Sequence, residues 1–176
     1  LALLFGRPGA GKSTIAAAVA EHNATIATAD LDVCLPVWMK ENFARGVYPT
    51  LEQRQEFAKG AGDYVQKFLD QHDVPFEGLD KSSEDSPAAC TTCLISFSFV
   101  NTDLRDYFRT RFPGAVWCLV DTSGPMAAER LATREGHFYK GPKDDSAEWA
   151  FAPVDFEHLR LDGAVDVTEN ARTLVS

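Results

Sequence analysis

The stretch "GRPGAGKST", from Gly6 to Thr14, decides the fold. It places four residues between Gly6 and the triplet Gly11-Lys12-Ser13, which is the G-x-x-x-x-G-K-[ST] pattern of phosphate-binding loops. The apolar run "LALLF" before it is typical of a buried strand, and "KSTIAAAVAEHN" after it is typical of a helix. A glycine-rich turn without a ligand is the alternative, but this strand-to-helix context is the one that the pattern requires. The stretch therefore predicts a loop that binds the phosphates of a nucleotide.

Each part of this loop has a predicted task. Backbone N–H groups turned inward would surround the phosphate oxygens, and the helix that follows would point its positive N-terminal end at the same anion. Lys12 is predicted to be catalytic, because its point charge would lie beside the outer phosphates. The hydroxyl of Ser13 is a candidate ligand for Mg²⁺. The loop residues predicted to bind ATP are Gly9, Ala10, Gly11, Lys12, Ser13 and Thr14.

The composition bounds the class of protein. A chain of 176 residues with 45% hydrophobic and 24% charged residues suits one globular domain, expected to span residues 1–176. A net charge of -9 argues against a nucleic-acid partner, which would need clustered Lys and Arg. No apolar run approaches the 18 or so residues that span a bilayer, so no membrane partner is expected. The expected partner is a small-molecule substrate, and a homodimer is left open.

Four scattered cysteines favour a reduced, cytoplasmic setting over a disulfide framework. Because the chain begins at Leu1 inside a predicted strand and has no Met there, the native N-terminus is expected to lie upstream. Cys90-Thr-Thr-Cys93 has the spacing of a redox or metal site, but no second Cys or His pair accompanies it. Its role is left open.

Strand-like and helix-like patterns alternate along the chain. Strands are expected at residues 1–5, 24–29, 93–99, 115–120 and 158–163, and helices at 12–23, 51–71, 124–136 and 166–176, with an exposed loop at 77–89. This alternation predicts an α/β fold with three αβα layers, in which helices cover both faces of a mostly parallel five-stranded sheet. Ligands bind beyond the carboxyl ends of such strands. Asp30, Asp32, Asn101 and Asp121 lie at those ends.

Three further stretches resemble small P-loop kinases, a group that includes gluconokinase and, more distantly, shikimate kinase. They are "GVYPTLEQR" (46–54), "LISFSFVNTDLRDYFR" (94–109) and "AERLATREGHF" (128–138). The resemblance implies a P-loop NTPase fold with a helical lid, ATP and Mg²⁺ as cofactors, and transfer of the γ-phosphoryl group to a hydroxyl of a small metabolite. Gluconate, or a similar sugar acid or polyol, is the first acceptor that it implies.

Asp30 and Asp32 match the paired acids that follow the second strand in these kinases. The resemblance implies that Asp30 holds the water shell of Mg²⁺ and that Asp32 receives the proton of the acceptor hydroxyl. Phosphoryl transfer does need a metal, neutralised charge and an oriented nucleophile, which supports the two roles independently. The alternative is a pair of solvated loop carboxylates.

Arg130 and Arg134 lie four residues apart on a predicted helix, so they would share one face. With the resemblance, this indicates a lid over the triphosphate at about residues 126–148, in which both arginines bind ATP and Arg134 is catalytic. Surface ion pairs with the neighbouring glutamates are the alternative. His137 matches the lid motif but has no assigned task, and the lysines at 140 and 143 would touch phosphate or face water.

The chain departs from gluconokinases in its acceptor site. It lacks their His after the paired acids and carries Asn101 where they carry Lys. Arg54 and Arg105 remain as candidate anchors for an acidic substrate. The candidate walls of the acceptor pocket are Trp38, Phe43, Tyr48 and Phe97. A nucleoside monophosphate kinase and a nucleotide-binding module without catalysis stay open as alternatives.

Overall fold

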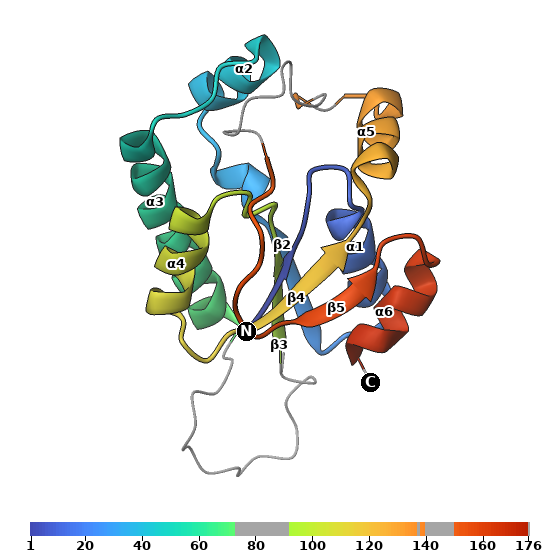
Figure 1. Cartoon of the computed structure of the whole chain (residues 1–176). Helices are drawn as coiled ribbons and strands as arrows, with labels where there is room; N and C mark the ends of the chain where they lie inside the picture. The colour runs from blue at the N-terminus through green and yellow to red at the C-terminus, as the bar shows by residue number, and fades with distance from the viewer. Residues whose placement is uncertain (73–91, 137, 140–149, 176) are drawn as a thin grey trace.

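A computed structural model describes residues 1–72, 92–136, 138–139 and 150–175 (Figure 1). Its centre is a five-stranded sheet in the order β2-β3-β1-β4-β5, and every strand pair is parallel. The strands are β1 (Ala2–Phe5), β2 (Ile26–Asp30), β3 (Thr92–Ser96), β4 (Val116–Asp121) and β5 (Leu159–Asp162). Parallel neighbours need long crossover connections, which matches the alternation of strands and helices along the sequence. The predicted α/β fold is confirmed.

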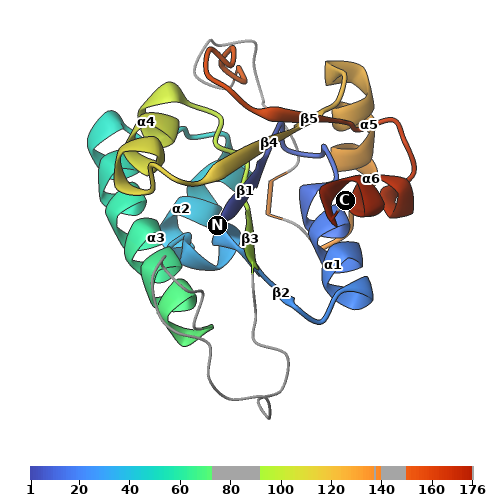
Figure 2. The ribbon, with the colours of Figure 1, turned by 90° about the horizontal axis from the view of Figure 1, so that it is seen from below.

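Helices cover both faces of the sheet (Figures 1 and 2). On one face lie α1 (Lys12–His22) and α6 (Val167–Val175), and on the other lie α3 (Leu51–Gln71) and α4 (Thr102–Arg111). In β1, Leu4 packs into the core under α1 and α6, whereas Leu3 and Phe5 pack into the core under α3 and α4. Because both faces are covered, every residue of this strand can be apolar, which explains the uninterrupted run in the sequence.

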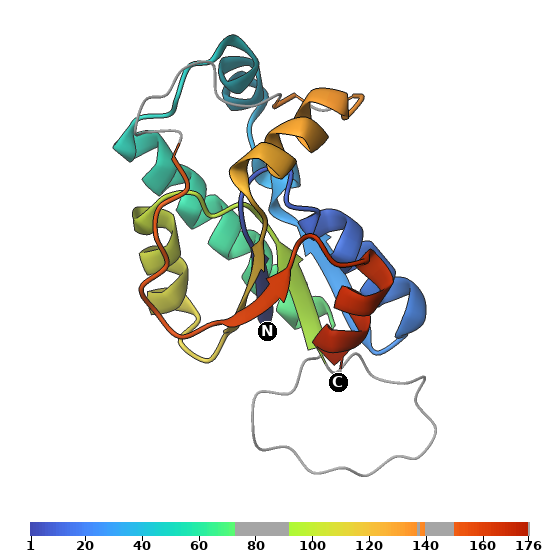
Figure 3. The same cartoon turned by 45° about the vertical axis from the view of Figure 1, so that its right-hand side comes forward.

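Two further helices stand at the carboxyl ends of the strands, on either side of the sheet edge (Figures 1 and 3). They are α2 (Val37–Arg45), which follows a short 3-10 helix η1 (Leu31–Cys34), and α5 (Gly124–Thr133). The helical ranges expected from the sequence include neither α2 and η1 nor α4. Pro36 at the N-cap of α2 and Gly46 after its last residue, with a left-handed φ of 77°, are the local signals that mark its two ends.

The boundaries of the elements follow local chemistry. Helix α3 covers the predicted range 51–71 and begins with a capping box, in which Thr50 and Gln53 satisfy each other's backbone N–H groups. Strand β3 ends at Ser96, three residues earlier than expected. The buried Phe99 has a φ of 47°, so the chain leaves the extended conformation there.

Several predictions from the sequence lie outside the described residues. These are the exposed loop at 77–89, the first cysteine of the Cys90-Thr-Thr-Cys93 pair, His137 and the lysines at 140 and 143. Cys93 is described and is fully buried in β3. Among the described helices, none combines the length and apolar character that crossing a membrane requires.

Arg105 belongs to the core and not to the substrate pocket, which corrects its interpretation as an anion anchor. Its side chain is only 2% exposed. The guanidinium donates to the carbonyl oxygens of Phe99 at 2.7 Å, Val100 at 3.2 Å, and Ala152 and Pro153 at 2.9 Å each. Arg105 thus fastens the strained turn after β3 to the segment that leads into β5. The sequence could not reveal this, because the last two carbonyls lie 47 and 48 residues away.

Replacing Arg105 by Ala is expected to destabilise the fold by about 3 kcal/mol or more, because the variant leaves several carbonyl groups without their donor. Urea unfolding followed by circular dichroism would measure the change. Arg172→Ala in α6, an exposed position, is the control and should change the free energy of unfolding by about 0.5 kcal/mol or less. Equal effects of the two substitutions would show that other donors replace the guanidinium.

Candidate active site

The loop between β1 and α1 has the geometry of an anion site. Gly9 and Gly11 have φ values of 84° and 93°, which favour glycine, and a Cβ on Gly9 would lie 2.4 Å from the carbonyl oxygen of Ala127 in α5. Within the described part of the chain, five backbone N–H groups of the loop and the first turn of α1 donate to no protein acceptor. They belong to Gly9, Gly11, Lys12, Ser13 and Thr14. Together with the N-terminus of α1, these amides can bind phosphate oxygens.

Lys12 lies under this loop with only 8% of its surface exposed. Its Nζ donates to the carbonyl oxygens of Gly6 at 3.1 Å and Arg7 at 2.9 Å. Burial lowers the pKa of the ammonium to about 8, although the carboxylates of Asp32 and Asp30 act in the opposite direction. Lys12 is therefore still charged at pH 7, and a bound phosphate would favour the charged form further.

The affinity for ATP is expected to fall as the pH rises above 8. In the free protein Lys12 has a pKa of about 8, and phosphate raises that value, so binding above pH 8 requires the uptake of a proton. The affinity should fall by at most about tenfold per pH unit. Titration calorimetry with a non-hydrolysable ATP analogue between pH 7 and 10 would measure the affinity. The Lys12→Met variant has no ammonium at this position, so its affinity should not show this dependence on pH. An affinity independent of pH over that range would contradict the lowered pKa.

Asp30, the last residue of β2, links that strand to the end of β3 and to the N-terminus of α1. Its Oδ2 accepts hydrogen bonds from the hydroxyls of Ser13 at 2.5 Å and Ser96 at 3.0 Å, and its Oδ1 accepts from the backbone N–H of Asp32 at 2.9 Å. Strands β1 and β2 are not neighbours in the sheet, because β3 lies between them, and Ser96 at the end of β3 bridges the gap.

Ser96 was not predicted as a site residue. Its position at the end of a buried strand is the signal that could have found it.

Ser13 and Asp30 fit the predicted magnesium site. Their hard oxygen atoms meet at the N-terminus of α1, and Mg²⁺ in kinases uses one or two protein ligands with phosphates and waters. In the described residues no group of three or more His, Cys, Asp or Glu side chains could hold a metal. A Mg²⁺ ion here would therefore take its other ligands from the nucleotide and from water.

A cavity of about 130 Å³ opens between the phosphate loop, α2 and α5. It brings together five of the predicted site residues with charged side chains, which are Lys12, Asp30, Asp32, Arg54 and Arg134. Its aromatic lining includes the predicted Phe43, Tyr48 and Phe97, and also Phe57, Phe138 and Tyr139, which were not predicted. Trp38 does not line it, because its side chain is 41% exposed on α2.

Asp32 lies in η1, half-buried, at the wall of this cavity. Both Asp30 and Asp32 act electrostatically on the ammonium of Lys12, so the two carboxylates and the lysine share one site. Asp30 caps η1 through the N–H of Asp32 and thereby fixes the backbone of the second acid. The arrangement places a carboxylate in the cavity beside the phosphate loop.

Arg54 lines the cavity, but its charge is paired. Its Nε donates to the carboxylate of Asp103 at 3.0 Å, its Nη1 donates to the carbonyl oxygen of Pro49 at 2.9 Å, and the guanidinium lies 5.6 Å from the ring centroid of Tyr48. The hydroxyl of Tyr48 donates to Oδ1 of Asn101. These contacts hold Tyr48 and Asn101 in the wall of the cavity.

The two predicted lid arginines have different positions. Arg130 donates to the carbonyl oxygens of Ala10 at 3.3 Å and Gly163 at 2.9 Å, so it ties α5 to the phosphate loop and to the turn after β5. Arg134 lines the cavity. They do not share a helix face as predicted, because α5 ends at Thr133 and Arg134 is its extended C-cap.

Neither a protein-family model nor a curated protein matches the sequence. Solved structures do match. A sugar kinase from Janibacter sp. HTCC2649 superposes with a TM-score of 0.71 at 18% identity, covering 99% of this chain and 91% of that one. A gluconokinase from Sinorhizobium meliloti 1021 has a TM-score of 0.61 at 18% identity, covering 97% and 86%.

The APS kinase CysC from Mycobacterium tuberculosis, solved in complex with AMPPNP and APS, also has a TM-score of 0.61, at 15% identity, with 99% of this chain and 95% of that chain covered. At such identities the likeness concerns the arrangement of the elements and not the substrate. The all-parallel sheet with helices on both faces agrees with the fold of these kinases. The chain has the fold of the small P-loop kinases.

Proposed function

We propose that this protein is an ATP- and Mg²⁺-dependent kinase that transfers the γ-phosphoryl group to a hydroxyl of a small metabolite. The observation that carries the proposal is the single cavity lined by Lys12 and Ser13 of the phosphate loop on one side and by Asp32 and aromatic side chains on the other. A nucleotide-binding module without catalysis would not need a carboxylate and an aromatic-lined space beside its phosphate loop.

Separate groups of residues bind the nucleotide and hold the metal ion. The amides of Gly9 and of residues 11–14 bind the phosphates of ATP, whereas the N–H of Ala10 donates to the carbonyl oxygen of Arg7. Lys12 and Arg134 stabilise the negative charge that spreads over the transferred group. Ser13 and Asp30 hold Mg²⁺, which when bound neutralises the charge of the phosphate oxygens. Arg130 acts on ATP through the loop, because it donates to Ala10 and not into the cavity.

Asp32 orients the acceptor hydroxyl and takes its proton. The acceptor oxygen forms a bond to the γ-phosphorus while the bond from that phosphorus to the bridging oxygen of ADP breaks. The proton passes to the carboxylate of Asp32, and ADP leaves with the electron pair. The predicted lid, about residues 126–148, would exclude water, which competes as an acceptor.

A sugar acid or polyol such as gluconate is the acceptor class that the resemblance to gluconokinase suggests. The fold shared with the Janibacter sugar kinase and the Sinorhizobium gluconokinase is consistent with it. Arg54 is the cationic side chain on the acceptor side of the cavity that such a carboxylate would use, and Asp103 already neutralises it. The general kinase activity is therefore better supported than this particular acceptor.

ADP formation measured with a panel of acceptors would test the function. The panel contains sugar acids, polyols, shikimate, nucleosides, nucleoside monophosphates and hydroxymethylpyridines. We expect at least one of them to stimulate ADP formation in the presence of Mg²⁺, and the Lys12→Ala variant to abolish that stimulation. Tight ATP binding without stimulation by any acceptor would favour the non-catalytic module.

A further inference from the structure

We propose that the acceptor carries its hydroxyl on an arm attached to a planar heteroaromatic ring, as in a hydroxymethylpyridine or a nucleoside. This inference rests on the proposed kinase function and names the substrate class of the same cavity. It follows from the aromatic walls of the acceptor side, from the pairing of its polar side chains and from the one amide group that faces it.

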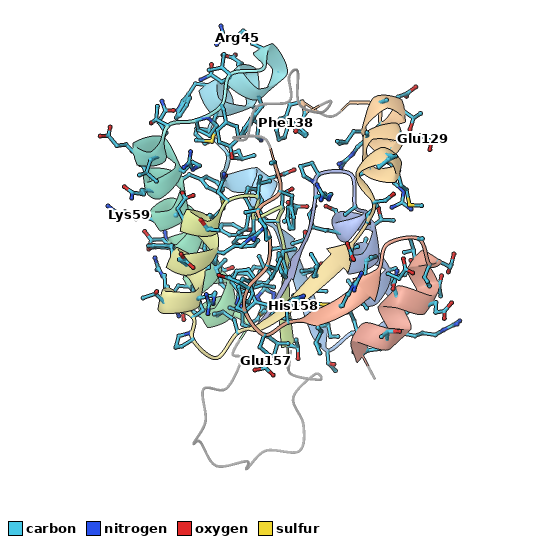
Figure 4. All side chains as sticks on the ribbon, viewed as in Figure 1. Arg45, Lys59, Glu129, Phe138, Glu157 and His158 are labelled. Carbon is cyan, nitrogen blue, oxygen red and sulfur yellow. The ribbon has the colours of Figure 1, made fainter. Side chains whose placement is uncertain are left out.

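Two aromatic pairs form the walls. Phe43 of α2 stacks on Phe138, with ring centroids 6.2 Å apart and an interplanar angle of 29°. Phe57 of α3 lies against Phe97 after β3, with centroids 5.3 Å apart. All four side chains line the cavity and are only half-buried. Figure 4 shows Phe138 between α2 and α5, beyond the carboxyl ends of the strands. Four flat aromatic side chains in one cavity favour a ligand with a planar ring, which can stack on them.

Two of the polar side chains on this side, Arg54 and Tyr48, already have partners. Arg54 is paired with Asp103, and the hydroxyl of Tyr48 is donated to Asn101. A sugar acid has a hydroxyl on nearly every carbon, and each one that is buried without a partner lowers the affinity. The aromatic half of the cavity therefore suits a ring better than a chain of hydroxyl groups.

Asn101 supplies one directional contact. Its Oδ1 accepts from Tyr48, and among the described residues its Nδ2 has no hydrogen-bond partner, although Asn101 lines the cavity. The amide N–H₂ is thus left as a donor for the ligand. A ring nitrogen or ring carbonyl would accept this hydrogen bond, whereas a plain hydrocarbon ring would not.

The reacting hydroxyl lies at the other end of the same ligand. Asp32 and Lys12 line the cavity where it meets the phosphate loop. A ring between the two aromatic pairs would direct a short hydroxylated arm toward Asp32. Ring and arm would occupy one continuous cavity, because the aromatic pairs, Asp32 and the phosphate loop all line it.

The experiment compares kcat/KM for a hydroxymethylpyridine, a nucleoside, gluconate and a polyol. Phe43→Leu and Phe138→Leu keep apolar volume but remove the flat face, so each should lower kcat/KM for the ring-bearing acceptor by about 5- to 150-fold. The Kd of ATP should stay the same. Phe68→Leu, a half-buried ring on α3 outside the cavity, is the matched control and should leave kcat/KM unchanged. Asn101→Leu should selectively weaken acceptors with a ring nitrogen or ring carbonyl.

The outcomes separate this inference from the proposed function. Phosphorylation of gluconate or a polyol in preference to every ring compound, with no effect of the two Phe→Leu changes, would overturn the inference and leave the kinase activity standing. No transfer to any acceptor despite ATP binding would overturn both. Calorimetry of the ring compounds on the protein with a non-hydrolysable ATP analogue checks binding directly in every variant.

Discussion

Replacing Asp32 by Asn is expected to lower acceptor-dependent ADP formation by about 100- to 10,000-fold, the usual contribution of a general base. The amide keeps the size and hydrogen-bonding shape of the carboxylate but cannot take the proton of the acceptor hydroxyl. ATP affinity should change little, because Asp32 lies in η1, outside the phosphate loop, and acts on Lys12 through its electrostatic field. Steady-state kinetics with a saturating acceptor and calorimetry with ATP would measure the two quantities.

The control for this substitution is Asp70→Asn, which removes one carboxylate from the exposed end of α3 and should leave turnover unchanged. A loss of ATP affinity in Asp32→Asn, with turnover preserved at saturating ATP, would make Asp32 a residue of the metal site. The general-base role would then be wrong.

Replacing Lys12 by Ala is expected to reduce phosphoryl transfer by at least about 100- to 1,000-fold and to weaken ATP binding. The charge lost is the one closest to the outer phosphates, in a buried site where water cannot replace it. The fold should tolerate the change, because burial disfavours the charged form of this side chain, as its lowered pKa shows. Calorimetry with ATP and thermal unfolding together would test both parts.

Lys59→Ala on α3 is the control for Lys12, because that side chain projects outward from the molecule (Figure 4). It should affect neither ATP binding nor transfer. An unchanged ATP affinity in Lys12→Ala would mean that the loop does not bind nucleotide in the proposed way.

Local patterns predicted the elements well where one stretch of sequence contains all of the required information. The phosphate loop depends on glycines at fixed spacing, and Gly9 and Gly11 do adopt positive φ. Helix α3 depends on an apolar stripe and an N-terminal cap within 22 residues, and its predicted limits are confirmed. The error at the end of α5 placed Arg134 on a helix face, although the last helical residue is Thr133.

The sequence by itself determined the alternation of strands and helices, the phosphate loop and the position of the paired acids at a strand end, because each depends on neighbours along the chain. Only the tertiary structure decided that β3 lies between β1 and β2, that Ser96 bridges to Asp30, and that Arg105 serves distant carbonyls in the core. Strand order and buried hydrogen bonds depend on which segments meet in space, and burial then selects the partner of each polar group. The aromatic walls of the acceptor cavity likewise come from five separate segments that meet only in the folded chain, and none of these segments alone indicates a ring-binding site.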